Sequence, residues 1–326
     1  MNFRLKRRRF GQLALASAAT TVLSNLATKT VAQQPQLVIY GVRLTPASSS
    51  ITEDMADAGA ANKTPGIILQ SVDLATGQEL STTEISEQTV QNQQETTETV
   101  NKGFLIKKPC ERITAITTLS DGTVVVAASA ATKNGDFSRF IFYDPASKKP
   151  FGLKAKKIKQ NNTVESLLAI QNDQLLAIVS LKQGQPPFDL AVINPKSGQV
   201  DSGAALSLPI LPLGERFNNL AQSPDGTIYA TNIDSEGILF LVQFDLANKS
   251  PVTGRGKINR LVQLSFNGKA LEKDIASLAF SPSNQLFALA DPQDEGTNSL
   301  FTVDLKTGEM QLLRQFAVDQ IAVSKV

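Results

Sequence analysis

Apolar positions from residue 113 onward follow a repeating pattern that predicts short β-strands. Each unit opens with an apolar residue, two smaller or polar residues, Leu or Ile, and a small or apolar residue. A fixed unit repeated along most of a chain is typical of repeat architectures. The opening segment occurs five times: Ile113–Thr117, Val164–Leu168, Phe217–Ala221, Ile275–Ala279 and Val318–Ala322.

Three further strands are predicted in each unit. The first four opening segments run into tight polar turns such as Ser223-Pro224-Asp225-Gly226, in which Asp-Gly favours the left-handed conformations of hairpin loops. A short run rich in Val, Leu, Ile and aromatic residues follows, which favours a strand over a helix. A third strand ends in a turn that begins with Asp or Asn, and a fourth strand follows, for example Gln311–Phe316. The second strands are Thr123–Ala128, Gln174–Val179, Thr227–Thr231 and Gln285–Ala290.

The two ends of the chain complement each other. The first third-strand turn, Asp73–Gly77, has no opening segment before it, and Leu37–Arg43 instead reads like a second strand. The missing opening segment is Val318–Ser324 at the other end. We therefore predict an all-β fold over residues 33–326, a β-propeller of about five four-stranded blades closed by pairing of its N- and C-terminal strands. The units are longer than such a blade needs, which leaves room for six or seven blades.

The turns resemble those of the WD40/TolB-like propellers, whose units carry the same Ser-Pro-Asp-Gly and Asp-x-x-Thr-Gly turns. Here they stand at 223–226, 73–77 and 304–308. The resemblance covers nearly all of residues 36–326 and implies the architecture. The chain has no Trp, so the Trp-Asp signature of true WD40 repeats is absent and the scaffold functions of that family do not carry over.

Residues 1–32 read as an export signal. Lys6-Arg7-Arg8-Arg9-Phe10 resembles the twin-arginine consensus, and Leu13–Leu26 is too short and too polar to span a bilayer stably. Small residues at Thr30–Ala32 suit cleavage. We expect a twin-arginine signal peptide, with an ordinary secretory signal as the alternative, and no stable membrane span in the mature protein. It would reside in the periplasm, or in the thylakoid lumen of a photosynthetic bacterium.

Composition removes several kinds of chemistry. The chain has no His and one cysteine, Cys110, which excludes Ser-His-Asp triads, His-ligated metals, intrachain disulfides, zinc ribbons and iron–sulfur clusters. A metal would have to be a hard ion with oxygen ligands, such as Ca²⁺. Residues 1–32 hold six basic residues and no acid, so the rest of the chain has a net charge of −4. Nucleic acid is therefore not an expected partner.

Insertions are predicted on one face of the propeller. Turns between strands one and two and between strands three and four share one face, while the other connections share the opposite face. The first set looks short everywhere, and the second set holds every insertion, including the flexible segment at about 81–111. Long loops on a rigid scaffold commonly carry binding, so we expect this long-loop face to be functional, unless its loops merely drift. The insertions are Thr45–Pro65, Ser81–Glu111, part of Ala146–Thr163, Ser207–Glu215 and Asn267–Lys273.

Polar residues recur at the second position of the opening segments, which line the channel of a propeller. Glu165, Asn218 and Asp319 stand there and are predicted to hold Ca²⁺ through oxygen ligands. The set is similar in kind to the metal site of gluconolactonase-like propeller hydrolases. That resemblance implies a metal-polarised lactone or ester carbonyl, although the local motifs of that family do not match. The alternative is a set of solvated channel groups. Thr114 and Ala276 hold the same position in the other units.

Two functions remain. The first is an exported, non-enzymatic binding or assembly protein without a cofactor, which binds a protein, a glycan or a small ligand on its long-loop face. The second is a Ca²⁺-dependent hydrolase or lactonase. The lack of a catalytic set favours the first. Calcium in the acidic loops Asn232–Gly237 and Asp291–Gly296, a reactive Cys110 beside Arg112, and an organic cofactor loaded before export are further hypotheses.

Overall fold

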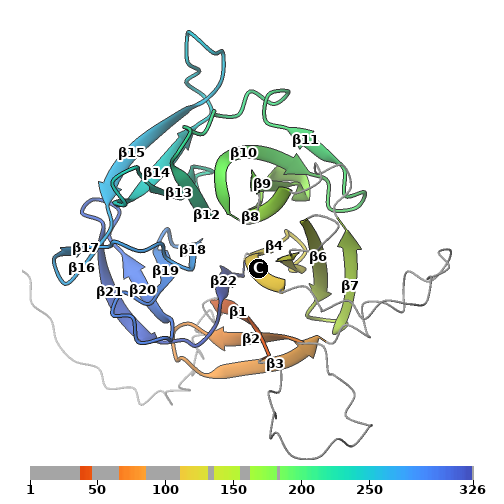
Figure 1. Ribbon diagram of the computed structural model, residues 1–326. Helices are drawn as coiled ribbons and strands as arrows, with labels where there is room; N and C mark the ends of the chain where they lie inside the picture. The colour runs from red at the N-terminus through yellow and green to blue at the C-terminus, as the bar shows by residue number, and fades with distance from the viewer. Residues whose placement is uncertain are drawn as a thin grey trace, which may run out of the picture. The chain divides into compact units, whose positions relative to one another are not determined.

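Five antiparallel sheets stand in a ring and form a five-bladed β-propeller (Figure 1). The computed structural model describes residues 37–45, 66–85, 111–130, 136–154, 162–181 and 184–324. These belong to one unit, Pro35–Val326. The predicted fold class is confirmed.

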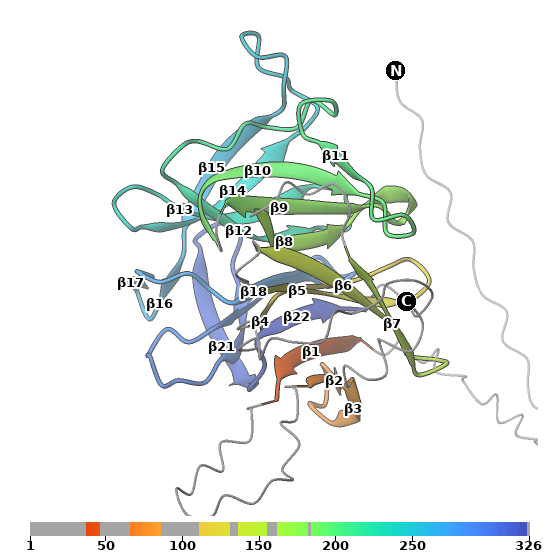
Figure 2. The same cartoon turned by 45° about the vertical axis from the view of Figure 1, so that its right-hand side comes forward.

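Each blade runs from an inner strand at the channel to an outer strand at the rim (Figures 1 and 2). Blade 1 contains β22 (Gln320–Val323), β1 (Val38–Leu44), β2 (Ile67–Asp73) and β3 (Glu79–Ile85). Blade 2 contains β4 (Glu111–Thr118), β5 (Val124–Ala130), β6 (Phe137–Asp144) and β7 (Lys149–Lys154). Blade 3 contains β8 (Asn162–Ala169), β9 (Leu175–Leu181), β10 (Gln185–Ile193) and β11 (Val200–Ser202).

Blade 4 contains β12 (Arg216–Gln222), β13 (Ile228–Ile233), β14 (Leu239–Asp245) and β15 (Lys257–Gln263). Blade 5 contains β18 (Ser277–Phe280), β19 (Leu286–Ala290), β20 (Ser299–Val303) and β21 (Glu309–Gln315). A small hairpin of β16 (Ser265–Phe266) and β17 (Lys269–Ala270) extends blade 5 at its rim, where β16 pairs with β21 in parallel. The only helix in the described residues is one turn of 3₁₀, Gln171–Asp173, and no helix among them is long and apolar enough to cross a bilayer.

The ends of the chain close the ring as predicted. Strand β1 lies between β2 and β22 and pairs antiparallel with both. Beyond the paired residues, Asp319 N–H donates to the carbonyl of Val42 and Ser324 N–H to that of Val38, each at 2.8 Å. The pairing satisfies the edge of β1 that would otherwise be open.

The core is divided among the five interfaces between blades. Each of the five clusters of buried apolar side chains combines residues from two adjacent blades. A blade is therefore covered on both faces, and a strand in the middle of a blade can be buried along its whole length rather than at alternate residues. All seven residues of β5, Val124–Ala130, are buried for this reason.

Neighbouring inner strands are also joined by hydrogen bonds from buried polar side chains. Thr117 Oγ1 in β4 accepts from the N–H of Ala169 in β8 at 3.0 Å. Ser166 Oγ in β8 accepts from the N–H of Leu220 in β12 at 2.7 Å. Because every inner strand takes part, these bonds form a complete ring around the channel. The remaining links are Asn219 Nδ2 to Ile275 O at 2.8 Å, Ser277 Oγ with Ile321 N and O at 3.2 Å, and Thr118 Oγ1 to Val323 O at 3.0 Å.

The predicted division into short and long faces is wrong in blade 4. The connection between β14 and β15, residues 246–256, belongs to the face expected to be short, yet it forms an extended loop (Figure 1). Two of the expected insertions are also partly built into the core. Leu208 and Leu211 of Ser207–Glu215 are buried against blades 3 and 4, and Leu271 of Asn267–Lys273 is buried in the cluster between blades 4 and 5. The leucines of these insertions are apolar, so they pack into the interfaces between blades instead of staying exposed to solvent.

Several predictions concern residues outside the described ranges. These are the twin-arginine signal at 1–32, the insertion between Thr45 and Gly66, most of the insertion after β3, and Cys110. Strand β3 extends to Ile85, so Ser81–Ile85, expected to open the flexible segment, is instead part of blade 1.

The inter-blade ring predicts a measurable effect of Ser277→Ala. This change removes the bonds between Ser277 Oγ and both peptide groups of Ile321, and it leaves buried groups without these partners. We expect a loss of about 1–3 kcal/mol in the free energy of unfolding, measured by urea denaturation. Ser235→Ala in an exposed turn is the control, and equal stability of the two variants would contradict the contribution of the ring.

Candidate functional site

Three of the five inner strands contain a β-bulge. The pairing of β4 shifts at Thr114, that of β8 at Glu165, and that of β12 between Asn218 and Ala221. A bulge adds one unpaired residue and redirects its side chain. The residue at the second position of the opening segment is therefore the bulged residue in β4, Thr114, and in β8, Glu165. In β12 the residue at this position, Asn218, lies next to the bulge. These strand ends surround the channel mouth on the long-loop face.

Glu165 is held by its protein neighbours. Its side chain is 5% exposed, and its carboxylate accepts hydrogen bonds from Arg112 Nη2 at 2.5 Å, from Ser180 Oγ at 2.6 Å, and from Thr163. Ser180 Oγ in turn accepts from the N–H of Gly184 at 2.8 Å. A guanidinium and two hydroxyl donors satisfy a buried carboxylate, so the main role of Glu165 in this arrangement is to join blades 2 and 3.

Asp319 has a different role in the structure. Its side chain is exposed, and its Oδ2 accepts from the N–H of Leu44, the last residue of β1, at 3.0 Å. The carboxylate thereby extends the pairing between β1 and β22 by one more contact. Asp319 is part of the closure of the ring.

Asn218 and Asn219 form hydrogen bonds with a half-buried carboxyl group, that of Asp274. Asp274 accepts from Asn218 Nδ2 at 3.4 Å, and from Asn219 Nδ2 and Thr231 Oγ1 at 3.3 Å. Burial raises the pKa of Asp274 above its usual range, while the nearby Arg216 guanidinium acts in the opposite direction. Asn219 adopts a left-handed backbone with φ of 55°, a conformation that Asn tolerates better than most residues.

The three predicted calcium ligands therefore have separate partners. No hydrogen bond among the described residues joins any two of Glu165, Asn218 and Asp319. Within the same residues no group of three or more Cys, Asp or Glu side chains is placed to hold a metal. The donor set at Glu165 does not fit a divalent cation well, because Arg112 already neutralises it. The calcium site stays a prediction.

The carboxylates of the two acidic loops bind their own backbones. Asp291 accepts from the N–H groups of Glu295 and Gly296 at 2.9 and 2.7 Å. Asp234 Oδ1 accepts from the N–H groups of Glu236 and Ile238, each at 3.0 Å, and its Oδ2 lies 3.5 Å from Arg260 Nη1. In these loops the carboxylates act as turn-stabilising groups.

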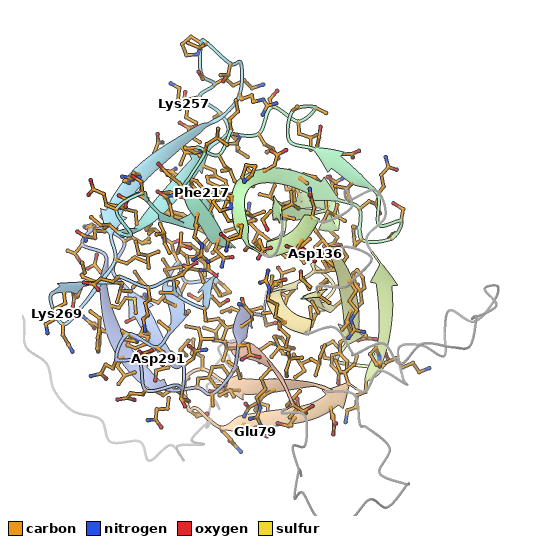
Figure 3. All side chains as sticks on the ribbon, viewed as in Figure 1. Glu79, Asp136, Phe217, Lys257, Lys269 and Asp291 are labelled. Carbon is orange, nitrogen blue, oxygen red and sulfur yellow. The ribbon has the colours of Figure 1, made fainter. Side chains whose placement is uncertain are left out.

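A cavity of about 430 Å³ opens on the long-loop face of blade 5. One wall is the connection that carries the β16–β17 hairpin, and the other is the loop after β19, which begins at Asp291. Lys269 and Asp291, both labelled in Figure 3, lie on blade 5 and belong to this lining. Lys273 Nζ and Asp294 Oδ1, 2.7 Å apart, bridge the two walls. Asp274 also lines the cavity, so the cavity adjoins the polar groups of the channel mouth.

The channel is narrow toward the opposite face, where Thr117, Thr118 and Gln222 line it beside apolar side chains. A small cavity of about 40 Å³ there is lined by residues from all five inner strands, among them Leu168, Leu220, Phe280 and Ile321. Phe217 at the start of β12, labelled in Figure 3, is buried in the apolar cluster between blades 3 and 4. The two polar clusters that contain charged side chains, around Glu165 and Asp274, lie at the long-loop end of the channel.

In blades 2 to 5 the residue directly before the opening segment is polar, and it was not among the predicted site residues. Arg112, Thr163, Arg216 and Asp274 hold that position in blades 2 to 5, and each takes part in one of the two polar clusters. The recurrence of a polar residue just before an apolar strand was visible in the sequence and could have indicated them. Which of them pair could not be read there.

No family model matches the chain, and no curated protein matches it. Among solved structures it is similar to a gluconolactonase from Xanthomonas campestris, with 11% identity and a TM-score of 0.42 over 77% of this chain and 73% of that chain. It is similar to TolB from Acinetobacter baumannii, with 12% identity and a TM-score of 0.42 over 89% of this chain and 66% of that chain.

A protein of unknown function from Dyadobacter fermentans is similar at 8% identity, with a TM-score of 0.46 over 86% of this chain and 84% of that chain. TolB and gluconolactonase-like propellers are thus among the similar structures. Likenesses at these levels carry no argument about ligand or activity, and the propeller assignment rests on the strand order itself.

The contacts of Glu165 give a test of the calcium hypothesis. We expect Glu165→Gln to lower the free energy of unfolding by about 1–3 kcal/mol because the change weakens its bond with Arg112, and to do so equally in EDTA and in CaCl₂. Glu236→Gln, at an exposed loop position, is the control. A rise in the melting temperature of the wild type on adding calcium, absent in Glu165→Gln, would instead support the metal.

Asp274 gives a pH-dependent prediction. Its folded pKa is raised above the usual 3.8, so the wild type loses stability as the pH rises from that value through the folded pKa. Asp274→Asn has no such loss. The difference in melting temperature, variant minus wild type, should therefore be larger at about pH 7 than at about pH 3.5. A difference that does not change with pH would show that Asp274 titrates as an ordinary carboxyl.

Proposed function

We propose that this chain is an exported, non-enzymatic binding protein that holds a small polyhydroxyl ligand, of the saccharide class, in the cavity on the long-loop face of blade 5. The single observation that carries the proposal is the cavity between two walls from separate connections, bridged by Lys273 and Asp294. Export rests on the sequence of residues 1–32 alone.

The size of the cavity supports a small ligand. Pockets for small molecules commonly enclose about 300–1,000 Å³, and this one encloses about 430 Å³. Its walls are connections on a rigid scaffold, the usual location of binding residues. In the hairpin that forms one wall, β16 pairs with β17 and also with β21 of blade 5. Because backbone hydrogen bonds hold this wall in place, the site is preformed rather than built from a mobile loop.

The chemistry of the lining supports a neutral polyhydroxyl compound. The lining contains both hydrogen-bond acceptors and hydrogen-bond donors: carboxylates at Glu272 and Asp274, an amide at Gln293 and an ammonium group at Lys269. Hydroxyl groups both donate and accept, so they match a mixed set of this kind. Phe266, packed edge-on against Phe301 with ring centroids 5.3 Å apart, adds an apolar surface on which the carbon face of a sugar ring can rest.

A loop exchange tests the proposal. Leu271 N–H already donates to the carbonyl of Leu264 at 2.9 Å, so replacing residues 265–270 by Asn-Gly closes the chain in a two-residue turn and removes one wall. Titration calorimetry with a panel of neutral mono- and oligosaccharides should show binding by the wild type. We expect this binding to be lost in the loop exchange and weakened at least tenfold by Gln293→Ala, about 1.4 kcal/mol.

The matched control is a second loop exchange on the opposite side. Ser250 N–H donates to the carbonyl of Arg255 at 2.7 Å, so residues 251–254 can be replaced by Asn-Gly in the same way. This variant should bind the saccharide as the wild type does. Absence of binding across the panel by the wild type, or equal loss in both loop exchanges at unchanged melting temperature, would refute the proposed site.

A further inference from the structure

The loop between β14 and β15, residues 246–256, projects from the rim of blade 4 in both views (Figures 1 and 2). Val252, in the middle of this loop, is 90% exposed. An aliphatic side chain held away from the body of a protein loses the benefit of burial unless something covers it. The loop is anchored at its base, since Ser250 and Arg255 are hydrogen-bonded to each other.

A second segment supplies more exposed apolar surface at the base of the loop. Gly256 N–H donates to the carbonyl of Ser207 at 2.9 Å, which places the connection between β11 and β12 against the loop. Leu206 and Ile210 of that connection are 45% and 54% exposed, and Leu246 at the start of the loop is 38% exposed. We call Leu206, Ile210, Leu246, Val252, Lys249 and Lys257 the blade-4 rim.

The charge around this apolar surface is mostly positive, with Asp245 beside it as an acidic residue. Between Asp245 and Glu272 the sequence holds five basic residues and no acid, and residues 203–214 hold no charge at all. Lys249 and Lys257 are exposed. Lys249 belongs to none of the ion pairs found among the described residues, whereas Lys257 lies opposite Asp245 in the pairing of β14 with β15. Lys257 stands at the base of the projecting loop in Figure 3. Residues 33–326 as a whole are net negative, so this is a local reversal of charge.

We propose that the blade-4 rim docks on an anionic lipid surface. The exposed aliphatic side chain at the middle of the loop would enter the boundary between headgroups and acyl chains, and the flanking lysines would meet the lipid phosphates. The apolar side chains of the protrusion match the acyl-chain boundary of a bilayer, and its cations match the anionic headgroups above that boundary. The proposal does not depend on the saccharide cavity, which lies on a different blade.

A fluorescent probe at the loop tests docking at the residue concerned. The full chain carries Cys110→Ser, so that Val252→Cys provides the one thiol for an environment-sensitive fluorophore. We expect a blue shift of its emission on vesicles of equal parts phosphatidylglycerol and phosphatidylcholine. The shift should be absent on pure phosphatidylcholine, and it should be reversed in about 1 M NaCl, where the Debye length is about 3 Å. The local readout separates loop docking from membrane binding by the basic residues at 4–9.

The control probe is Leu312→Cys in the same background, because Leu312 is 55% exposed on β21 of another blade. It should show no shift. Lys249→Glu should weaken vesicle binding of the Val252→Cys probe at least about fivefold, the factor that corresponds to the loss of one basic residue near an anionic surface. Lys306→Glu, the same charge change in an exposed turn of blade 5, should leave it unchanged.

Three results would overturn the proposal. The first is no shift at position 252 on anionic vesicles although the variant has the melting temperature of the wild type. The second is an equal shift at position 312. The third is a shift at position 252 that appears with protein concentration in the absence of lipid, which would assign the rim to contacts between copies of this chain.

Discussion

The structure depends on a ring of hydrogen bonds that passes from one inner strand to the next. Thr117, Ser166, Asn219, Ser277 and Thr118 each bond the backbone of a neighbouring blade from a buried position. Apolar packing between blades is strong but non-directional, whereas a buried hydrogen bond has a narrow geometry and a high cost when it is left unmade. The ring therefore fixes how the blades register against each other around the channel.

The charged side chains of the channel collect at its long-loop end. Toward the opposite face the inner strands approach with Leu, Ile and Phe side chains and with the uncharged polar side chains of Thr117, Thr118 and Gln222, and they leave little space. At the long-loop end, bulges in β4, β8 and β12 redirect side chains, and the buried charges that result need partners. Arg112 supplies one for Glu165, while Asn218, Asn219 and Thr231 surround Asp274. These clusters join blade 2 to blade 3 and blade 4 to blade 5.

The connection from blade 4 to blade 5 links architecture to the proposed binding. Between β15 and β18 the chain forms the β16–β17 hairpin on the rim of blade 5, then returns to the channel mouth at Asp274. One segment thus builds a wall of the cavity and also contributes Ile275, the acceptor in the link between blades 4 and 5. A ligand in this cavity would lie against the part of the ring that holds the two blades together.

The sequence by itself determined the order of strands in a blade and the closure of the ring, and it favoured about five blades while leaving room for six or seven. Repeated opening segments and Asp-Gly turns are local signals, and the complementary halves at Leu37–Arg43 and Val318–Ser324 require only that sheet edges be paired. It also indicated that the second position of the inner strand is special, because polar residues there interrupt an apolar run. Both the bulges at Thr114 and Glu165 and the latch formed by Asp319 lie at that position.

Only the tertiary structure decided which polar groups meet. Glu165 pairs with Arg112 from 53 residues earlier in the chain, and Asn219 with Asp274 from 55 residues later. Such pairings depend on the rotation between neighbouring blades, which no local pattern encodes. The burial of residues in the long connections also depends on distant parts of the chain. The segment Ser207–Glu215 is polar enough at its ends to predict a loop, yet Leu208 and Leu211 are buried in the interface between blades 3 and 4. Whether an apolar residue in a connection is buried depends on the space that two blades leave between them.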